Sequence, residues 1–515
     1  MTNTQEEIWP VSAFNPAIAE AELPRKNSAT LIWVLAACAC ALIVALFLAR
    51  QATLLRLAFP LVTGAVAVAC YLRRPGVYIQ FTMWIWILTP CVRRIVDWRC
   101  GFENQNLILL TPLFVTAISA FTVLYKSRDI NRFLLVPFVL CTAGVFFGFF
   151  SGIIHLALHL KTQESFPGMV YGLAIWICPI LFALYIALEW RQREEIVRAI
   201  SSVYFWSLLL TGAYTLFQYV TPWPWDIDWL NNVKHYSLSN NTFGEPESFH
   251  LRVWGTLNSP GTFATFLLCA IVLVTFMKPR LRYLALLLGY IALMISMVRI
   301  MWISWLLAMA LVALILRSKG AMRMVITVVL IPLAILPALY IATPDKLTSR
   351  FSTLTDIRSD SSYQERQNMY VHAFDAVLSQ PSGYGLGQGT TNNKVNTYVL
   401  DSGILQILYS LGIQGTIFYA TGLLFAVSFA SRIIRSKRLR DNEFMVICGI
   451  LFLVLLLNSL SGNIFINFAG MLMWLFVGLL IQYLATQSPG EQSPKQVKKY
   501  VLSSKNALQT NGDAQ

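Results

Sequence analysis

Four arginines are the side chains best suited to chemistry in this chain, and they are Arg252, Arg299, Arg350 and Arg366. A guanidinium group binds phosphate oxygens through two parallel hydrogen bonds and stays charged near a low-dielectric boundary. Two or three converging arginines could therefore hold a pyrophosphate and stabilise it as it leaves a sugar. We expect Arg299 and Arg366 to act in catalysis, with Arg252 and Arg350 binding substrate. The alternative for Arg299 is an arginine that merely ends a helix and reaches for the membrane surface.

Carboxylates are scarce in the same segments, and Asp401 is the candidate general base. A carboxylate near the site could take the proton of an attacking hydroxyl group. The alternative for Asp401 is a helix N-cap shared with Ser402, a common role of Asp, and the two roles can coexist. Glu365, which directly precedes Arg366, is a candidate for substrate binding.

Two histidines, His155 and His159, are spaced to face one side of a helix. Two histidines alone make a poor metal site, and no further ligand pattern is apparent, so we expect no metal and no cofactor. Packing or a hydrogen bond from His155 to substrate is the more natural interpretation. The cysteine pair Cys91 and Cys100 brackets a predicted outside loop and could form a disulfide in an oxidising compartment.

A glycine run between Gly383 and Gly389 resembles a nucleotide-binding loop in composition only. It follows no predicted strand and opens no nucleotide-binding helix. The run could bring backbone amides near an anion, but a flexible turn is the simpler interpretation.

The elements that must position these residues are membrane helices. Of the 515 residues, 57% are hydrophobic and 12% are charged, against roughly 25% charged in soluble domains. The apolar runs are continuous and long enough to cross a hydrocarbon core as helices. We predict an all-α polytopic membrane protein with about 14 (roughly 12 to 14) spanning helices. The predicted spans are 29–49, 54–72, 77–95, 107–125, 132–158, 168–188, 196–220, 259–277, 281–298, 300–316, 322–342, 404–430, 443–460 and 464–484.

Basic residues in the short loops orient these spans. With both termini in the cytoplasm, the basic clusters fall inside, as the positive-inside rule requires, so the net charge of +14 needs no nucleic-acid partner. The outside face then carries a loop at 221–258, the corner at Arg299 and a long polar segment. The predicted organisation is a cytoplasmic tail (1–28), an N-terminal helical half (29–220), the outside loop (221–258), central helices (259–342), a large outside catalytic loop (343–403), C-terminal helices (404–486) and a disordered tail (487–515).

The outside loop 221–258 is rich in aromatic residues, including Trp223 and Trp225. Such residues form a belt at the membrane interface or a surface that stacks on sugars. The belt is the simpler interpretation.

Several short motifs are similar to those of the bacterial O-antigen polymerase and O-antigen ligase family. The segment Arg252–Ala264 looks like the family's Gly…Asn-x-Pro entry into a span, and Ser296–Arg299 is similar to its Ser-Arg turn. The segment Arg366–Gly389 looks like its periplasmic Arg…Pro-x-x-Gly-x-Gly stretch. The most specific motif is Asp401-Ser402, nine residues, then Gly412 and Gly415. Ligases of the family carry His where this chain has Asp401, and aspartate looks more like the polymerases and exopolysaccharide-assembly members.

The resemblance implies a GT-C-like membrane glycosyltransferase with a large periplasmic loop in the bacterial inner membrane. Its donor and acceptor would be undecaprenyl-pyrophosphate-linked oligosaccharides, which it would join into a surface polysaccharide or exopolysaccharide. A chain-length regulator or an export complex would be a further partner. The alternative within the class is a ligase that transfers a finished glycan to lipid or protein. From a different class, a flippase or transporter also has many spans, but no paired repeat halves are apparent here.

Overall fold

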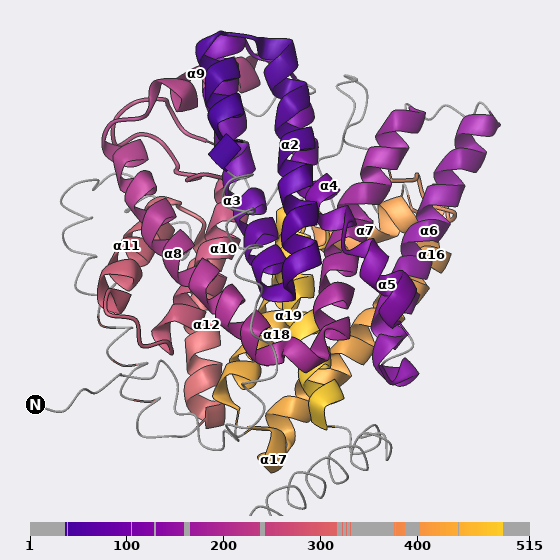
Figure 1. The fold of residues 1–515 in the computed structure, drawn as a ribbon. Helices are drawn as coiled ribbons and strands as arrows, with labels where there is room; N and C mark the ends of the chain where they lie inside the picture. Colours follow the sequence, from indigo (N-terminus) through magenta and orange to yellow (C-terminus); the bar gives the residue numbers. More distant parts are fainter. Residues whose placement is uncertain are drawn as a thin grey trace, which may run out of the picture.

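Helices make up the architecture in the computed structural model (Figure 1), which describes residues 37–487 except 39, 105, 128–129, 159–164, 237–242, 317–321, 323–325, 327–329, 331–374, 376, 387–401 and 441. Among these residues there is no strand, only an isolated bridge between Gly244 and Leu251. The prediction of an all-α membrane protein is confirmed. The helices, with η marking 3-10 turns, are α2 (Ala52–Arg73), α3 (Pro75–Cys100), η2 (Leu107–Leu110), α4 (Thr111–Ala117), α5 (Ala120–Lys126), α6 (Arg132–Ala157), α7 (Phe166–Leu188), η3 (Trp190–Gln192), α8 (Arg193–Val220), α9 (Pro224–Tyr236), α10 (Pro260–Thr275), α11 (Arg282–Ile295), α12 (Arg299–Leu316), α16 (Gly403–Arg435), α17 (Lys437–Arg440), α18 (Glu443–Asn458) and α19 (Asn467–Gln487).

Eight helical stretches in the described part are long and apolar enough to cross a membrane. They are Ala52–Arg73, Leu107–Lys126, Arg132–Ala157, Phe166–Leu188, Trp190–Val220, Arg299–Leu316, Gly403–Arg435 and Asn467–Gln487. The helices α10, α11 and α18 are apolar but shorter. The predicted total of about 14 spans therefore stays a prediction.

Two predicted boundaries need correction. The segment 221–258 is not all loop, because Pro224 opens the helix α9, as proline commonly does at a first helical turn. The span predicted at 404–430 is interrupted, because Gly412 has φ 68° and ψ −178° inside α16. This backbone conformation is essentially restricted to glycine, so the chain bends there.

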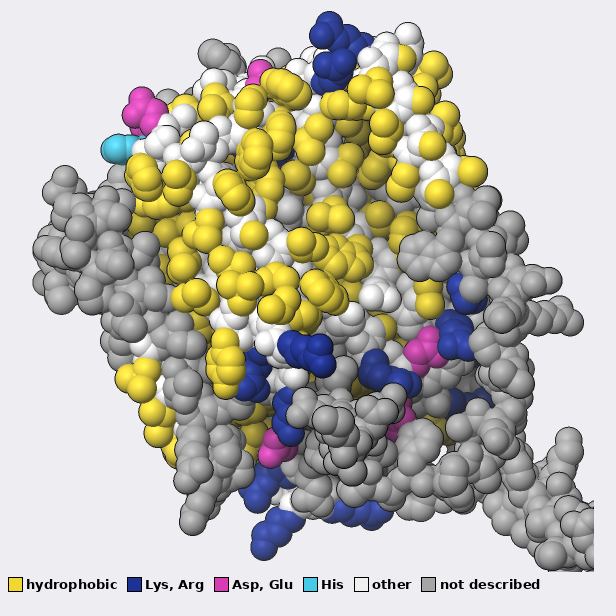
Figure 2. Space-filling view, turned by 60° about the vertical axis from the view of Figure 1, so that its left-hand side comes forward, with side chains coloured by type: hydrophobic (Ala, Val, Ile, Leu, Met, Phe, Trp, Pro, Cys, Tyr) yellow, Lys and Arg dark blue, Asp and Glu magenta, His cyan; other side chains and the backbone are white. Residues whose placement is uncertain are grey.

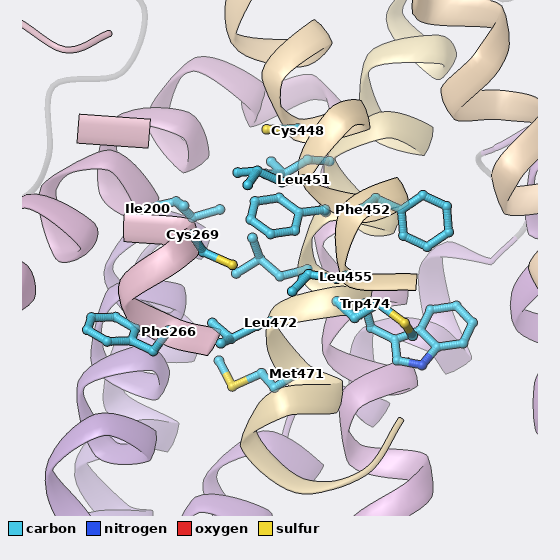
Figure 3. Packing of buried hydrophobic residues seen from close by; sticks show 14 of the residues in the cluster. Ile200, Phe266, Cys269, Cys448, Leu451, Phe452, Leu455, Met471, Leu472 and Trp474 are labelled. Carbon is cyan, nitrogen blue, oxygen red and sulfur yellow. The ribbon is translucent and has the colours of Figure 1, made fainter. Parts of the chain in front are cut away.

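The centre of the molecule is α19. Its most apolar window is 94% buried, and it packs against α7, α10, α16 and α18. Figure 3 shows side chains of α18 and α19, among them Leu451, Leu455 and Leu472, meeting Phe266 and Cys269 of α10. Because α19 is apolar on all sides, other helices can pack around its whole circumference, as its burial shows.

The outer surface and the two ends differ in character. Hydrophobic side chains cover most of the described face in Figure 2, and many Lys and Arg side chains gather toward its lower edge. That edge is the end at which α17 lies (Figure 1), which we call the α17 end. Opposite it lies the α9 end, where α9 and the first turns of α2 are seen.

The two cysteines considered for a disulfide, Cys91 and Cys100, are both free. They lie nine residues apart on the single helix α3. At ~1.5 Å of rise per residue their Cα atoms are roughly 13 Å apart, about twice the separation that a disulfide can bridge. The disulfide hypothesis is therefore wrong.

Candidate active site

Three of the predicted site residues, Arg252, Arg299 and His155, lie in the described part of the chain. The other four, Arg350, Glu365, Arg366 and Asp401, lie outside the described residues. The site is therefore built from the first three and from the elements that hold them.

The corner between α11 and α12 lies where the charge of Arg299 interrupts the long apolar run. The helix α11 ends at Ile295, and α12 begins at Arg299 itself, which confirms the predicted break. Between them Met297 has φ 57°, a left-handed conformation that non-glycine residues seldom adopt. The Ser296 hydroxyl and the Trp302 indole N–H both donate to the Leu293 carbonyl, at 2.7 and 2.9 Å. These bonds hold the corner closed in one shape.

Arg252 reaches this corner from a distant part of the chain. One of its terminal nitrogens, Nη2, donates to the Met297 carbonyl at 3.5 Å. Both Arg252 and Arg299 are half-buried. The structure thus brings one predicted binding arginine to within two residues of the predicted catalytic arginine.

A buried cluster of polar side chains near the Arg252 segment was not predicted from the sequence. Arg94 on α3 is fully buried and pairs with Asp226 of α9, with 2.8 Å between Nε and Oδ1. Asp226 also accepts hydrogen bonds from Tyr214 (2.7 Å) and Gln218 (2.8 Å). The available signal was the pair Arg93-Arg94 inside a predicted span, since charges at such depth are costly and are kept for a role.

His155, near the end of α6, contacts the segment that precedes the glycine run. The Gln380 amide nitrogen lies 3.0 Å from Nδ1 and 3.1 Å from Nε2 of the imidazole, and the Ser382 hydroxyl lies 3.3 Å from Nε2. The Ser151 hydroxyl, one turn earlier, donates to the Gly383 carbonyl at 3.3 Å. In the described part His155 thus holds a backbone turn against α6, and its predicted contact with substrate stays a proposal. Its neighbour His159 lies outside the described residues.

The described part of the glycine run packs against the second half of the Asp401–Gly415 motif. The N–H groups of Tyr384 and Gly385 donate to the carbonyls of Tyr409 and Ser410, at 2.8 and 3.2 Å, and the rings of Tyr384 and Tyr409 stack with centroids 4.4 Å apart. Gly383 has φ 81°, and a Cβ placed on it would lie 2.3 Å from the Gly412 nitrogen. The described part of the run, up to Leu386, is therefore a turn as expected, but one that is packed and hydrogen-bonded into the break of α16.

The start of α16 is tied to the helix that begins at Arg299. The Gly403 N–H donates to the Ser459 carbonyl at 2.8 Å, and the Ser402 hydroxyl donates to the same oxygen at 3.4 Å. The preceding residue, Asn458, accepts a 2.7 Å hydrogen bond from Ser304 of α12. Thus α18 bridges α12 and the residue that follows Asp401 in the chain. Ser402 is the residue at the N-cap position of α16, but its side chain makes no capping hydrogen bond. Asp401, for which the N-cap alternative was considered, lies outside the described residues.

Metal ligands do not cluster in the described residues, where no group of three His, Cys, Asp or Glu side chains comes together. At the α9 end the described carboxylates of Asp97 and Asp226 are paired with arginines. Besides Arg94, Arg93 and Arg56 share the carboxylate of Asp97, at 3.0 and 3.3 Å.

Comparison with known proteins gives one match. No curated protein matches the chain. The family model of the O-antigen ligase domain (Wzy_C) matches residues 284–420. The matched region contains the corner at Arg299, the turn at 380–386 and the start of α16. Residues 284–420 are therefore similar to the O-antigen ligase domain, which is consistent with the Wzy-type O-antigen polymerase and ligase family.

Proposed function

We propose that this protein is a polysaccharide polymerase that joins lipid-linked oligosaccharide repeats. The family match supports glycan transfer of the O-antigen ligase or polymerase type. The observation that supports transfer from a lipid pyrophosphate is the approach of Arg252 to the Met297 carbonyl, beside the first residue of α12, Arg299. Asp401, where ligases of the family carry His, favours the polymerase over the ligase. Two half-buried guanidinium groups at one corner form a site for a diphosphate group.

In the proposed reaction a sugar hydroxyl of one repeat attacks the anomeric carbon of another. The new C–O bond forms as the bond from that carbon to undecaprenyl pyrophosphate breaks, with inversion. The pyrophosphate leaves with the bonding electrons, and Arg299 and Arg252, joined by Arg366 and Arg350 from the polar segment, stabilise its charge. The hydroxyl proton passes to Asp401, and Glu365 and His155 help to bind the sugars.

The bridge through α18 supports the pairing of Asp401 with Arg299. Ser402 and Gly403 are fixed on the Ser459 carbonyl, and Asn458 is fixed on α12, the helix that Arg299 begins. A base and an anion site on opposite sides of a sugar must keep a constant separation during an inverting attack. The hydrogen bonds of this bridge supply such a constraint.

The distribution of charge supports a periplasmic site. Many Lys and Arg side chains gather toward the α17 end, where α17 itself contributes Lys437, Arg438 and Arg440. By the positive-inside rule this end faces the cytoplasm. The corner at Arg299 then faces the periplasm of the inner membrane, where lipid-linked repeats are displayed.

A ligase is the second candidate, because the matched family model is described as O-antigen ligase. A ligase would use the same arginines to hold the pyrophosphate but would pass a finished chain to a lipid or protein. The two functions differ in what a null mutant accumulates. Loss of a ligase leaves long lipid-linked polymer, whereas loss of a polymerase leaves single repeats.

Complementation of a deletion strain tests the proposal. The variants Arg299→Ala and Asp401→Asn should leave single repeats on the lipid carrier, as resolved by gel electrophoresis of extracted glycans. Arg280→Ala, an exposed arginine before α11 at the other end, is the matched control and should restore full-length polymer. Full polymer from both site variants would overturn the assignment of the site, and long lipid-linked chains in the deletion strain would identify a ligase.

A further inference from the structure

The ion pair between Arg94 and Asp226 is the most completely buried charge pair that the structure describes, since neither side chain is exposed. Burying an arginine costs several kcal/mol unless charges and hydrogen bonds compensate it. Asp226 supplies the charge. The remaining donors of the guanidinium all point at one short stretch of chain.

That stretch is residues 254–258, and several of its polar groups are held by hydrogen bonds from Arg94 and Gln218. Arg94 donates to the Gly255 carbonyl at 2.7 Å, to the side-chain oxygen of Asn258 at 3.2 Å and to the Leu257 carbonyl. From the opposite direction, the Gln218 side-chain oxygen accepts the N–H groups of Trp254 and Gly255, at 3.2 and 3.0 Å. Because both N–H groups and carbonyls of this stretch are bonded to buried side chains, its backbone is restrained.

Arg252 lies two residues before Trp254, so the position of its backbone depends on this stretch. Its own N–H donates to the Phe243 carbonyl at 2.8 Å, which fixes the backbone on the other side. From there its side chain reaches the Met297 carbonyl. Hydrogen bonds therefore link Arg94 to residues 254–258, and a further hydrogen bond links Arg252 to the corner at Arg299.

We propose that Arg94 is a positioning residue for the proposed transfer reaction, which holds residues 254–258 so that Arg252 meets the corner at Arg299 and completes the diphosphate site. This inference rests on the proposed function. Lysine cannot replace Arg94 in this role. Lysine would keep a positive charge beside Asp226. Its single ammonium group cannot, however, donate to three acceptors that are placed around a planar guanidinium group.

The neighbouring Arg93 provides a matched control. It is also buried and also lies on α3, but it pairs with Asp97 and donates to the Glu103 carbonyl at 2.8 Å, away from residues 254–258. Arg93→Lys and Arg94→Lys thus make the same chemical change at adjacent buried positions. Only Arg94→Lys removes the hydrogen bonds that hold residues 254–258.

The experiment measures two properties of the full-length protein in lipid nanodiscs. Hydrogen–deuterium exchange of Arg94→Lys should rise in peptides covering 251–259 and 294–300, and the affinity for undecaprenyl pyrophosphate should fall about tenfold, the loss expected when one charged hydrogen bond is misplaced. Arg93→Lys should change exchange near Glu103 and leave affinity within about twofold of wild type. The double variant Arg94→Met with Asp226→Leu, which removes both charges, keeps the test available if the single variant folds poorly.

Three outcomes test the positioning role of Arg94 and the proposed function. Unchanged exchange and affinity in Arg94→Lys, or the same losses in Arg93→Lys, would overturn the positioning role. If wild-type protein does not bind undecaprenyl pyrophosphate, the proposed function fails, and the exchange data alone then show whether Arg94 holds the Arg252 segment. Local loss of protection together with weaker binding supports both.

Discussion

Replacing Gly412 by alanine should destabilise the protein, because it adds a methyl group to a tight contact between backbones at the break of α16. Gly412 has φ 68° and ψ −178°, a conformation that costs other residues ~1–3 kcal/mol. A Cβ at this position would also lie 2.4 Å from the carbonyl carbon of Ser382 and 2.6 Å from the nitrogen of Gly383. These are backbone atoms, so they cannot rotate away, and overpacking of this kind costs ~1–3 kcal/mol more.

The expected loss is therefore about 2–6 kcal/mol in the free energy of unfolding. At roughly 2 °C for each kcal/mol, this lowers the melting temperature by about 4 °C or more. The assay is thermal unfolding of detergent-solubilised protein, followed by size-exclusion chromatography with fluorescence detection. Polymer formation in the complemented strain should fall as well, because the turn at 380–386 leaves its place against α16.

Gly64→Ala is the control for this prediction. Gly64 lies inside α2, and a Cβ there would have no heavy atom within 4 Å. Alanine favours a helix over glycine by ~1 kcal/mol, so this variant should melt at or slightly above the wild-type temperature. If Gly412→Ala melts within 2 °C of Gly64→Ala, about the effect of 1 kcal/mol, the inferred packing of the glycine run on α16 is wrong.

The remaining predictions concern the other contacts of the site. Asn458→Leu should lower the rate of polymer formation at least tenfold, about 1.4 kcal/mol, with little change in lipid pyrophosphate binding. The reason is that it breaks the hydrogen-bonded bridge from α12 and leaves the arginines in place. Equal losses in rate and binding would contradict this prediction. His155→Ala should lower the melting temperature by a few degrees through the loss of hydrogen bonds worth ~1 kcal/mol each, and Gln380→Ala should mimic it, whereas a catalytic His155 would lose activity without loss of stability. Treatment of purified protein with EDTA should leave the rate of glycan transfer unchanged, since arginines carry the charge compensation; a loss restored by a divalent cation would require a metal site.

Local sequence patterns were sufficient where a single residue type decides the structure. A charge inside an apolar run too long for one span predicted the break before Arg299, and the break lies there. The apolar runs predicted α10, α18 and α19 to within about three residues, because burial in lipid or in a helical core requires continuous apolar helices. The same reasoning gave the correct class of membrane protein.

Patterns failed where the deciding partner is distant in the chain. The break at Gly412 depends on the close approach of Gly383, and neither glycine alone distinguishes a kink from an ordinary helical position. The role of Arg94 depends on acceptors as far as 164 residues along the chain. The glycine run, interpreted as a flexible turn, gained its significance only from this packing.

The sequence by itself determined the membrane class, the positions of the apolar helices and the residue types able to bind a diphosphate, because hydrophobicity and charge act locally and independently of the fold. Only the tertiary structure decided which of those residues meet. It brought Arg252 to the corner at Arg299, buried Arg94 beneath it and joined the start of α16 to α12 through Asn458. The physical reason is that buried polar groups must find partners, and a helical bundle supplies those partners from segments remote in sequence.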